Sequence, residues 1–268
     1  MKIPSFENKE QEIDFIIKNQ NKLIAFKKAS FKKADTFSFG PIETTKAIVN
    51  NKPVEEAEEE LKVKVVVNST NFLDSHNDVH IKGLWNKSIN ENKNIVHLQE
   101  HCMEFDKIIA DGSDLNVYTQ QFTFKQLGFE YDGKTECLIF ESKVKEDRNE
   151  FMYEQYSKGF VKNHSVGMSY VKMLLCANNP ASTQEFENWN KYLPEVANQE
   201  TAIEKGYFWA VLEAKLIEGS AVVIGSNPVT PTLENNMKAV NTLSENEPTE
   251  NVTQKMNEQE FNKLLNKF

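Results

Sequence analysis

Cysteine is scarce in this 268-residue chain, which also lacks an excess of basic residues and any long apolar run. Its three cysteines are odd in number and far apart, which is typical of reduced thiols in a cytosol and implies no disulfide framework. The formal net charge of −9 argues against nucleic-acid binding, because that needs a basic surface. No apolar run approaches the roughly 18 residues of a membrane span, so no membrane association is expected.

Composition divides the chain into three parts. Residues 1–60 are predicted to form a polar arm and linker, with a helix over 6–33 that is solvated by default and docks on a partner in the alternative interpretation. Residues 61–232 hold the apolar runs and are predicted to be the ordered domain. Residues 233–268 are rich in Asn, Glu and Thr and are predicted to be a flexible tail, with a small helix over 257–267.

The ordered part is predicted to be mainly β. About seven short runs rich in β-branched and aromatic residues alternate with turn signals. Helical spacing over 146–158 ends at Gly159, and a capping-box pattern at Ser182 and Glu185 opens a second helix. This pattern favours an α+β fold in which helices lie outside a β-barrel or sandwich.

One strand, predicted over residues 159–170, carries a candidate nucleophile. Alternation along a strand places Ser165 with Asn163, Gly167 and Ser169 on a face of small side chains. Such a face leaves room for a substrate backbone, although a tight contact between strands also explains it. The neighbouring His164 points the other way, so the base for Ser165 must come from another part of the chain.

A carboxylate is predicted at the end of the last strong strand, over 206–224. The apolar residues of that strand fall on even positions, and Glu218 continues the same phase. An inward-pointing carboxylate needs a partner. Ser165, one histidine and Glu218 could therefore form a catalytic triad, in which the imidazole takes the serine proton and the carboxylate stabilises the imidazolium.

Two segments also permit a metal interpretation. His97 and His101 lie close together, but without the HExxH spacing of zinc proteases. Acidic residues and histidines alternate over 74–80, where Asp-Ser-His-Asn-Asp is typical of a turn. Cys102 is adjacent to His101 in sequence, so in a strand the two side chains would point apart and form no thiol nucleophile pair.

Four blocks of the chain, in order, resemble the prohead proteases of tailed bacteriophages, the HK97-type capsid maturation proteases. They are residues 69–85, residues 98–109 with His101, residues 159–168 with Ser165, and residues 216–222 with Glu218. The chain departs from the family pattern at Gly219, where an apolar residue is usual, and at Cys102, where Asp is common.

This resemblance implies a serine endopeptidase with a closed, herpesvirus-assemblin-like β-barrel. Ser165 would be the nucleophile, His101 the base and Glu218 the third member, with no cofactor. The implied substrates are the major capsid protein precursor and scaffold protein, cleaved inside the assembling procapsid in the host cytoplasm, with self-association as a further possibility. The alternatives are a non-catalytic phage structural or scaffold-like protein, suggested by the polar arm and tail, and a metal hydrolase using His97 and His101.

Overall fold

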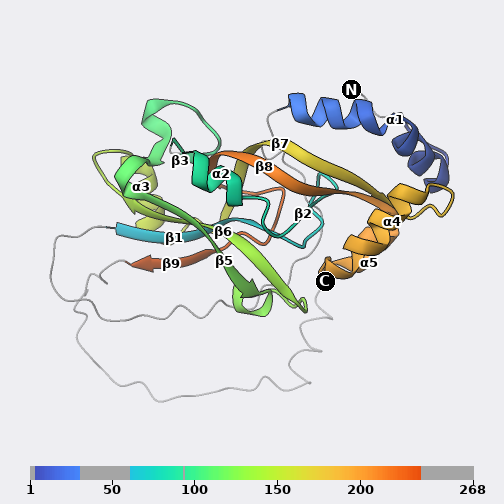
Figure 1. Ribbon diagram of the computed structural model, residues 1–268. Coiled ribbons are helices and arrows are strands. Elements are labelled where there is room, and N and C mark those ends of the chain that lie inside the picture. The colour runs from blue at the N-terminus through green and yellow to red at the C-terminus, as the bar shows by residue number, and fades with distance from the viewer. Residues whose placement is uncertain (1–3, 31–60, 93, 237–268) are drawn as a thin grey trace, which may run out of the picture. The chain divides into compact units, whose positions relative to one another are not determined.

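The computed structural model describes residues 4–30, 61–92 and 94–236, which form an α+β fold with two open β-sheets (Figure 1). The predicted tail helix over 257–267 and the linker over 34–60 lie outside the described residues. None of the helices in the described part is long and apolar enough to cross a membrane.

The first sheet is antiparallel throughout and has the strand order β5-β6-β1-β9. Its strands are β1 (Leu61–Ser69), β5 (Leu115–Thr123), β6 (Lys134–Val144) and β9 (Thr232–Asn236). β1, β5 and β6 match runs predicted as strands. β9 extends four residues beyond the predicted domain end at 232 and pairs with β1, because backbone pairing needs no apolar side chain.

The second sheet is built around a long central strand, β8 (Tyr207–Val222). β7 (Asn163–Ala177) runs antiparallel along one edge of β8, and two short strands run parallel to the other edge. These are β2 (Asp78–His80) and β3 (Val96–Gln99), and β3 in turn pairs with β4 (Ile108–Ala110).

The two sheets pack face to face, and Gly219 of β8 lies directly against the other sheet. A Cβ atom at this position would lie 2.5 Å from Cγ1 of Val67 and 2.6 Å from Cε2 of Phe140, in β1 and β6 of the other sheet. No side chain fits there without displacing the core. The glycine that departs from the family pattern therefore does not break the strand, since β8 continues through it to Val222.

The predicted closed β-barrel is wrong, because neither sheet closes on itself. One isolated bridge, between Asn163 of β7 and Pro231 just before β9, links the two sheets at a corner. In the described part of the chain this bridge does not grow into a ladder. A barrel needs every strand paired on both edges, whereas β5 and β4 each have one neighbour among the described residues. Proline has no N–H to donate, so at the bridge Pro231 can only accept.

Helices lie beside the sheets. They are α1 (Lys9–Ala29), α2 (Asn86–Glu91), α3 (Glu150–Ser157), α4 (Thr183–Tyr192) and α5 (Gln199–Lys205), with the single 3-10 turns η1 (Phe105–Lys107), η2 (Gly112–Asp114), η3 (Lys125–Leu127) and η4 (Leu193–Glu195). Two helix ends lie where the sequence predicts them. α3 is followed by Gly159 in the left-handed region, and α4 begins directly after Ser182. The capping box itself does not form, since Glu185 instead accepts a hydrogen bond from Gln20 of α1.

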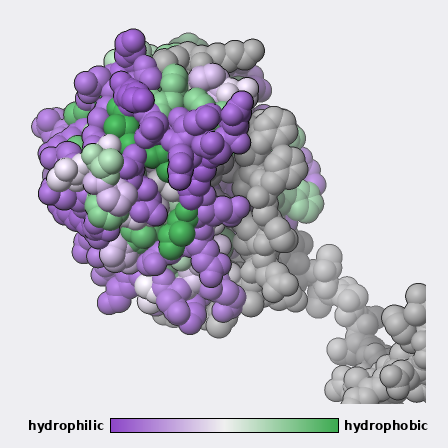
Figure 2. Space-filling view, turned by 90° about the vertical axis from the view of Figure 1, so that its right-hand side faces the viewer, coloured by the Kyte–Doolittle hydropathy of each residue, from purple (hydrophilic) through white to green (hydrophobic). Residues whose placement is uncertain are grey.

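α1 packs on the second sheet and is not a solvated arm. Ile13, Ile16 and Leu23 are buried against the main core. In Figure 1 the helix lies along β7, at the end of the fold that also carries α4 and α5. The surface at this end is mostly hydrophilic, with small apolar areas between the polar side chains (Figure 2).

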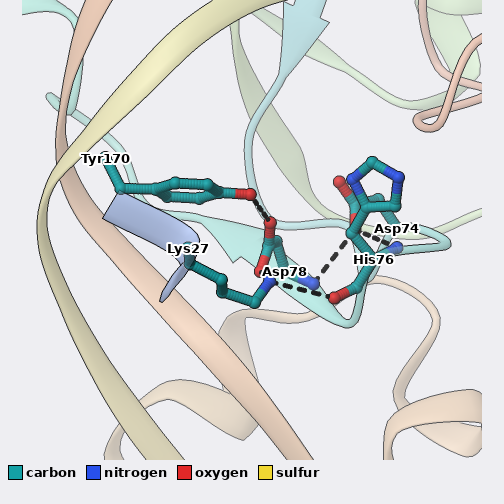
Figure 3. Close-up of polar contacts among 5 residues, drawn as sticks. All are labelled: Lys27, Asp74, His76, Asp78 and Tyr170. Carbon is teal, nitrogen blue, oxygen red and sulfur yellow. Dashed lines mark hydrogen bonds and ion pairs between the residues drawn. The ribbon is translucent and has the colours of Figure 1, made fainter. Parts of the chain in front are cut away.

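A polar cluster attaches the last turn of α1 to β2 and β7 (Figure 3). The Lys27 ammonium lies 2.6 Å from one carboxylate oxygen of Asp78, whose side chain is fully buried. Tyr170 of β7 donates a hydrogen bond of 2.5 Å to the other oxygen. Lys27 also donates to the carbonyl of His76, and its ammonium lies over the Tyr170 ring. A partly buried ion pair therefore adds to the apolar contacts of α1.

Candidate functional site

His101 and Glu218, which are far apart in sequence, form a buried pair at the end of the second sheet. β3 runs parallel to β8 with Val96 opposite Glu218, and His101 follows two residues after β3 ends. His101 Nδ1 lies 2.5 Å from Glu218 Oε1, and the two residues are 6% and 0% exposed. The carboxylate accepts the Nδ1 proton, which leaves Nε2 as the ring nitrogen that can take up another proton.

Ser165 lies beside this pair. β7 and β8 are antiparallel with Ser165 opposite Ser220 and Gly167 opposite Glu218. Residues directly opposite in such a pair point to the same face, with Cβ atoms about 5 Å apart. Ser220 bonds both to Glu218 and to the backbone of His101, so Ser165 stands next to the residue that links the other two. The predicted face of small residues is thus the face that carries the carboxylate.

The backbone at His101 has an uncommon conformation. Glu100 and His101 are consecutive non-glycine residues with φ angles of +51° and +58°. Each such residue costs on the order of 1 kcal/mol or more, and clusters of this kind concentrate at functional sites. The turn is held by a hydrogen bond from the Glu100 N–H to the Ala221 carbonyl and by one from the Cys102 N–H to the Gln99 carbonyl, both 2.9 Å long. The turn directs the His101 ring towards Glu218.

The two atoms that the predicted triad would use for proton transfer, Ser165 Oγ and His101 Nε2, take part in no hydrogen bond among the described residues. Among the described residues, His101 Nε2 is buried and has no hydrogen-bond partner. Within the same residues, no hydrogen bond engages the Ser165 side chain, which is 5% exposed. A buried imidazole nitrogen normally finds a partner. Among the described residues no hydrogen bond joins Ser165 Oγ to His101 Nε2, so proton transfer between them would need one of the two side chains to move.

The chain matches no family model, no curated protein and no solved structure. Its function must therefore be argued from its own residues, and the catalytic roles of Ser165, His101 and Glu218 stay predictions.

His97 and His164, the other two histidines near these strands, lie on the opposite face in the core. Tyr156 Oη of α3 bridges them, at 3.2 Å from His97 Nε2 and 3.0 Å from His164 Nε2. His97 Nδ1 lies 2.8 Å from Ser142 Oγ, and His164 Nδ1 donates to the Thr230 carbonyl. His97 and His101 therefore do not share a metal site, and His164 cannot reach Ser165, as strand alternation predicted.

This buried network predicts a loss of stability in acid. Burial lowers the pKa of His164 from 6.5 to about 4, and burial together with the neighbouring His164 holds the pKa of His97 well below 6.5. The unfolded chain binds these protons near pH 6.5, so it takes up more protons than the folded chain as the pH falls from about 6.5 to about 4. We expect the melting temperature to fall by roughly 5–10 °C between pH 7 and pH 5.

Thermal unfolding followed by circular dichroism at several pH values measures this loss. A His164→Gln variant provides the control, because an amide does not titrate, and its melting temperature should vary less over the same range. An identical pH dependence in the two proteins would show that the titration of His164 does not cause it.

The second metal candidate is a turn. Asp74, His76 and Asp78 bring potential ligand atoms within 4.8 Å of one another. However, Asp74 Oδ1 accepts the backbone N–H groups of His76 and Asp78, at 2.8 and 3.0 Å, as predicted for turn chemistry. Both carboxylate oxygens of Asp78 are bonded, to Lys27 and Tyr170. The carboxylate that a cation would need is thus already neutralised by an ammonium group, and the cluster serves to attach α1.

Sequence analysis missed Ser220, which contacts two of the three predicted site residues. It lies two positions after Glu218 in β8, so its side chain projects to the same face of the sheet. That spacing is visible in the sequence, but it does not indicate a site residue by itself, because serine is also an ordinary small residue of strands.

Proposed function

We propose that this chain is a serine endopeptidase that cleaves capsid precursor and scaffold protein during bacteriophage prohead maturation. One observation carries the catalytic part. The buried His101 has Nδ1 at 2.5 Å from the Glu218 carboxylate, and its Nε2 has no partner among the described residues. Ser165 lies on the strand next to Glu218, opposite Ser220. The capsid part is supported by the sequence resemblance alone.

In the proposed reaction, Ser165 Oγ attacks the carbonyl carbon of the scissile peptide and passes its proton to His101 Nε2. Glu218 stabilises the imidazolium that results, because its carboxylate stays on Nδ1. His101 then gives the proton to the departing amine, which leaves an acyl group on Ser165. Water, deprotonated by the same imidazole, releases the acyl group and restores the serine.

Two exposed apolar side chains near His101 support a polypeptide substrate in this proposal. Phe105, four residues after His101, is 92% exposed, and Met103 between them is also exposed. Exposed aromatic and methionine side chains are enriched where proteins bind other chains. These two side chains would contact a substrate backbone that enters the site from the His101 side.

A fluorophosphonate probe tests the catalytic proposal even though the substrate is unidentified. The probe reacts with serines that a neighbouring base activates, so we expect one adduct per chain on the peptide that contains Ser165, identified by mass spectrometry. Ser165→Ala should abolish labelling. Ser169→Ala is the matched control, on the same strand, and should keep it. An unlabelled folded protein would favour the alternative, a non-catalytic structural or scaffold-like protein.

The capsid part needs its own experiment. Co-expression with the major capsid precursor from the same genome should shorten that protein, and co-expression of the Ser165→Ala variant should leave it intact. A labelled but inactive protein in this assay would retain the catalytic proposal and reject the capsid substrate.

A further inference from the structure

Ser220 is the cross-strand neighbour of Ser165 and is completely buried. Its hydroxyl donates to Glu218 Oε2 at 2.6 Å, and its oxygen accepts the backbone N–H of His101 at 3.1 Å. One serine side chain thus joins the carboxylate to the backbone of the histidine. The hydroxyl has one proton and donates it to Glu218, so it does not point that proton at His101 Nε2, and Ser220 is unsuited to be the nucleophile.

Both groups that Ser220 holds need to be fixed in place. The two oxygens of Glu218 have separate partners, since Oε1 faces His101 and Oε2 faces Ser220, so the carboxylate cannot rotate away from the imidazole. His101 has a left-handed backbone, which persists only when its surroundings hold it. The backbone N–H of Glu100 bonds to the Ala221 carbonyl and that of His101 bonds to Ser220, so both residues are attached to β8 through their backbone as well as through the His101 ring.

We infer that Ser220 is a positioning residue of the proposed protease site, which holds Glu218 against His101 and holds the His101 backbone in place. This inference rests on the proposed function. Ser220 itself does not touch the reacting atoms in this arrangement. It acts through the other two residues, so its removal should slow the reaction without changing how substrate binds.

The competing explanation is that Ser220 only stabilises the fold, as any satisfied buried serine does. Ser142 of β6 provides the matched comparison. It is also a buried strand serine bonded to a histidine, but that histidine is His97, in the core network. If Ser220 only stabilises the fold, alanine at either serine should lower the melting temperature and leave the labelling rate of Ser165 unchanged. If Ser220 positions the site, only alanine at Ser220 should also slow the labelling.

The experiment measures the second-order rate of fluorophosphonate labelling at Ser165, with the melting temperature of every variant. We expect Ser220→Ala to slow labelling by about 10- to 100-fold, the effect of losing hydrogen bonds to a charged group. Ser142→Ala should lower the melting temperature but keep the labelling rate within about twofold. Ser220→Cys, which keeps the size of the side chain and a weak donor, should fall between. It provides a folded variant if the alanine variant unfolds.

A double variant tests whether Ser220 acts through the carboxylate. In a Glu218→Ala background the further effect of Ser220→Ala should shrink to about threefold or less, because the carboxylate it orients is gone. If the double variant instead slows labelling by the product of the two single effects, the two residues act independently and the inference is wrong. Unchanged labelling in Ser220→Ala would also overturn it. An unlabelled wild-type protein overturns the proposed function and this inference together. A labelled wild type with an unaffected Ser220→Ala variant rejects the inference alone.

Discussion

Replacing either Ser165 or His101 by alanine is expected to lower peptide-bond cleavage by about 10⁴- to 10⁶-fold, and replacing both should cost no more than replacing one. The serine is a poor nucleophile until the imidazole takes its proton, so neither residue contributes without the other. A proteome-derived peptide mixture offers many different peptide bonds at once, so the new termini counted by mass spectrometry measure cleavage whatever sequence the protein prefers.

Folding must be preserved for this comparison to hold. Ser165→Ala removes one oxygen from a small side chain that is 5% exposed and makes no hydrogen bond among the described residues, so stability should change by less than about 1 kcal/mol. Ser169→Ala again provides the control. Cleavage that survives in Ser165→Ala would reject the serine protease mechanism. A loss confined to Ser165→Ala would mean that another group acts as the base.

Lys27→Met should destabilise the protein by about 2–4 kcal/mol. It keeps the length of the side chain but removes the ammonium that lies 2.6 Å from the fully buried Asp78. Breaking a buried ion pair costs about 3–5 kcal/mol, and the lower value here reflects the partial exposure of Lys27. Urea unfolding followed by tryptophan fluorescence measures the change.

Lys28→Met is the matched control, because Lys28 is the next residue of α1 and is exposed. It should change stability by less than about 0.5 kcal/mol. Replacing Asp78 by asparagine in the Lys27→Met protein should recover part of the loss, since the buried charge is then removed as well. Equal effects of the two lysine substitutions would mean that the ion pair does not stabilise the docked helix.

The position of Ser165 could be predicted from the sequence because it depends on local alternation, which holds in its strand. Alternation also points to Glu218, but the β7–β8 register shifts between Leu216 and Glu218. Leu216 and Gly219 therefore both face the core. Glu218 is buried on the other face, against His101 and Ser220. The identity of the base came from the resemblance alone, because the turn at His101 has no local periodicity.

The closure of the sheets could not be predicted, because it depends on contacts between distant residues. β5 and β4 stay at open edges in the described part of the chain, where the only β-bridge between the two sheets is the one from Asn163 to Pro231. The docking of α1 was missed for a similar reason. Its apolar stripe is sparse in sequence, and Asp78, the partner of Lys27, lies in a segment that looked like an exposed turn.

The network around Tyr156 is a third feature that the sequence alone does not predict. From sequence alone, His97 and His164 look like suitable negative controls for the choice of base. In the structure both are buried and hydrogen-bonded in the core, so alanine there would leave polar partners unsatisfied. Loss of activity in such variants would report a damaged fold and would not identify the base.

The contacts of α1 also have a consequence for the order in which the protein forms during synthesis. Lys9 of this helix bonds to the carbonyl of Ile203, which is 194 residues later in the chain, and Glu12 contacts Tyr207 at the start of β8. At about 5–20 residues per second, a ribosome needs roughly 10–40 s to make that interval. β7, which α1 packs along, is complete before that point, so the first turn of the helix is the part that gains its partners last. Tyr207 begins the strand that also supplies Glu218, so the docking of α1 is completed in the same late stage of translation in which the candidate site assembles.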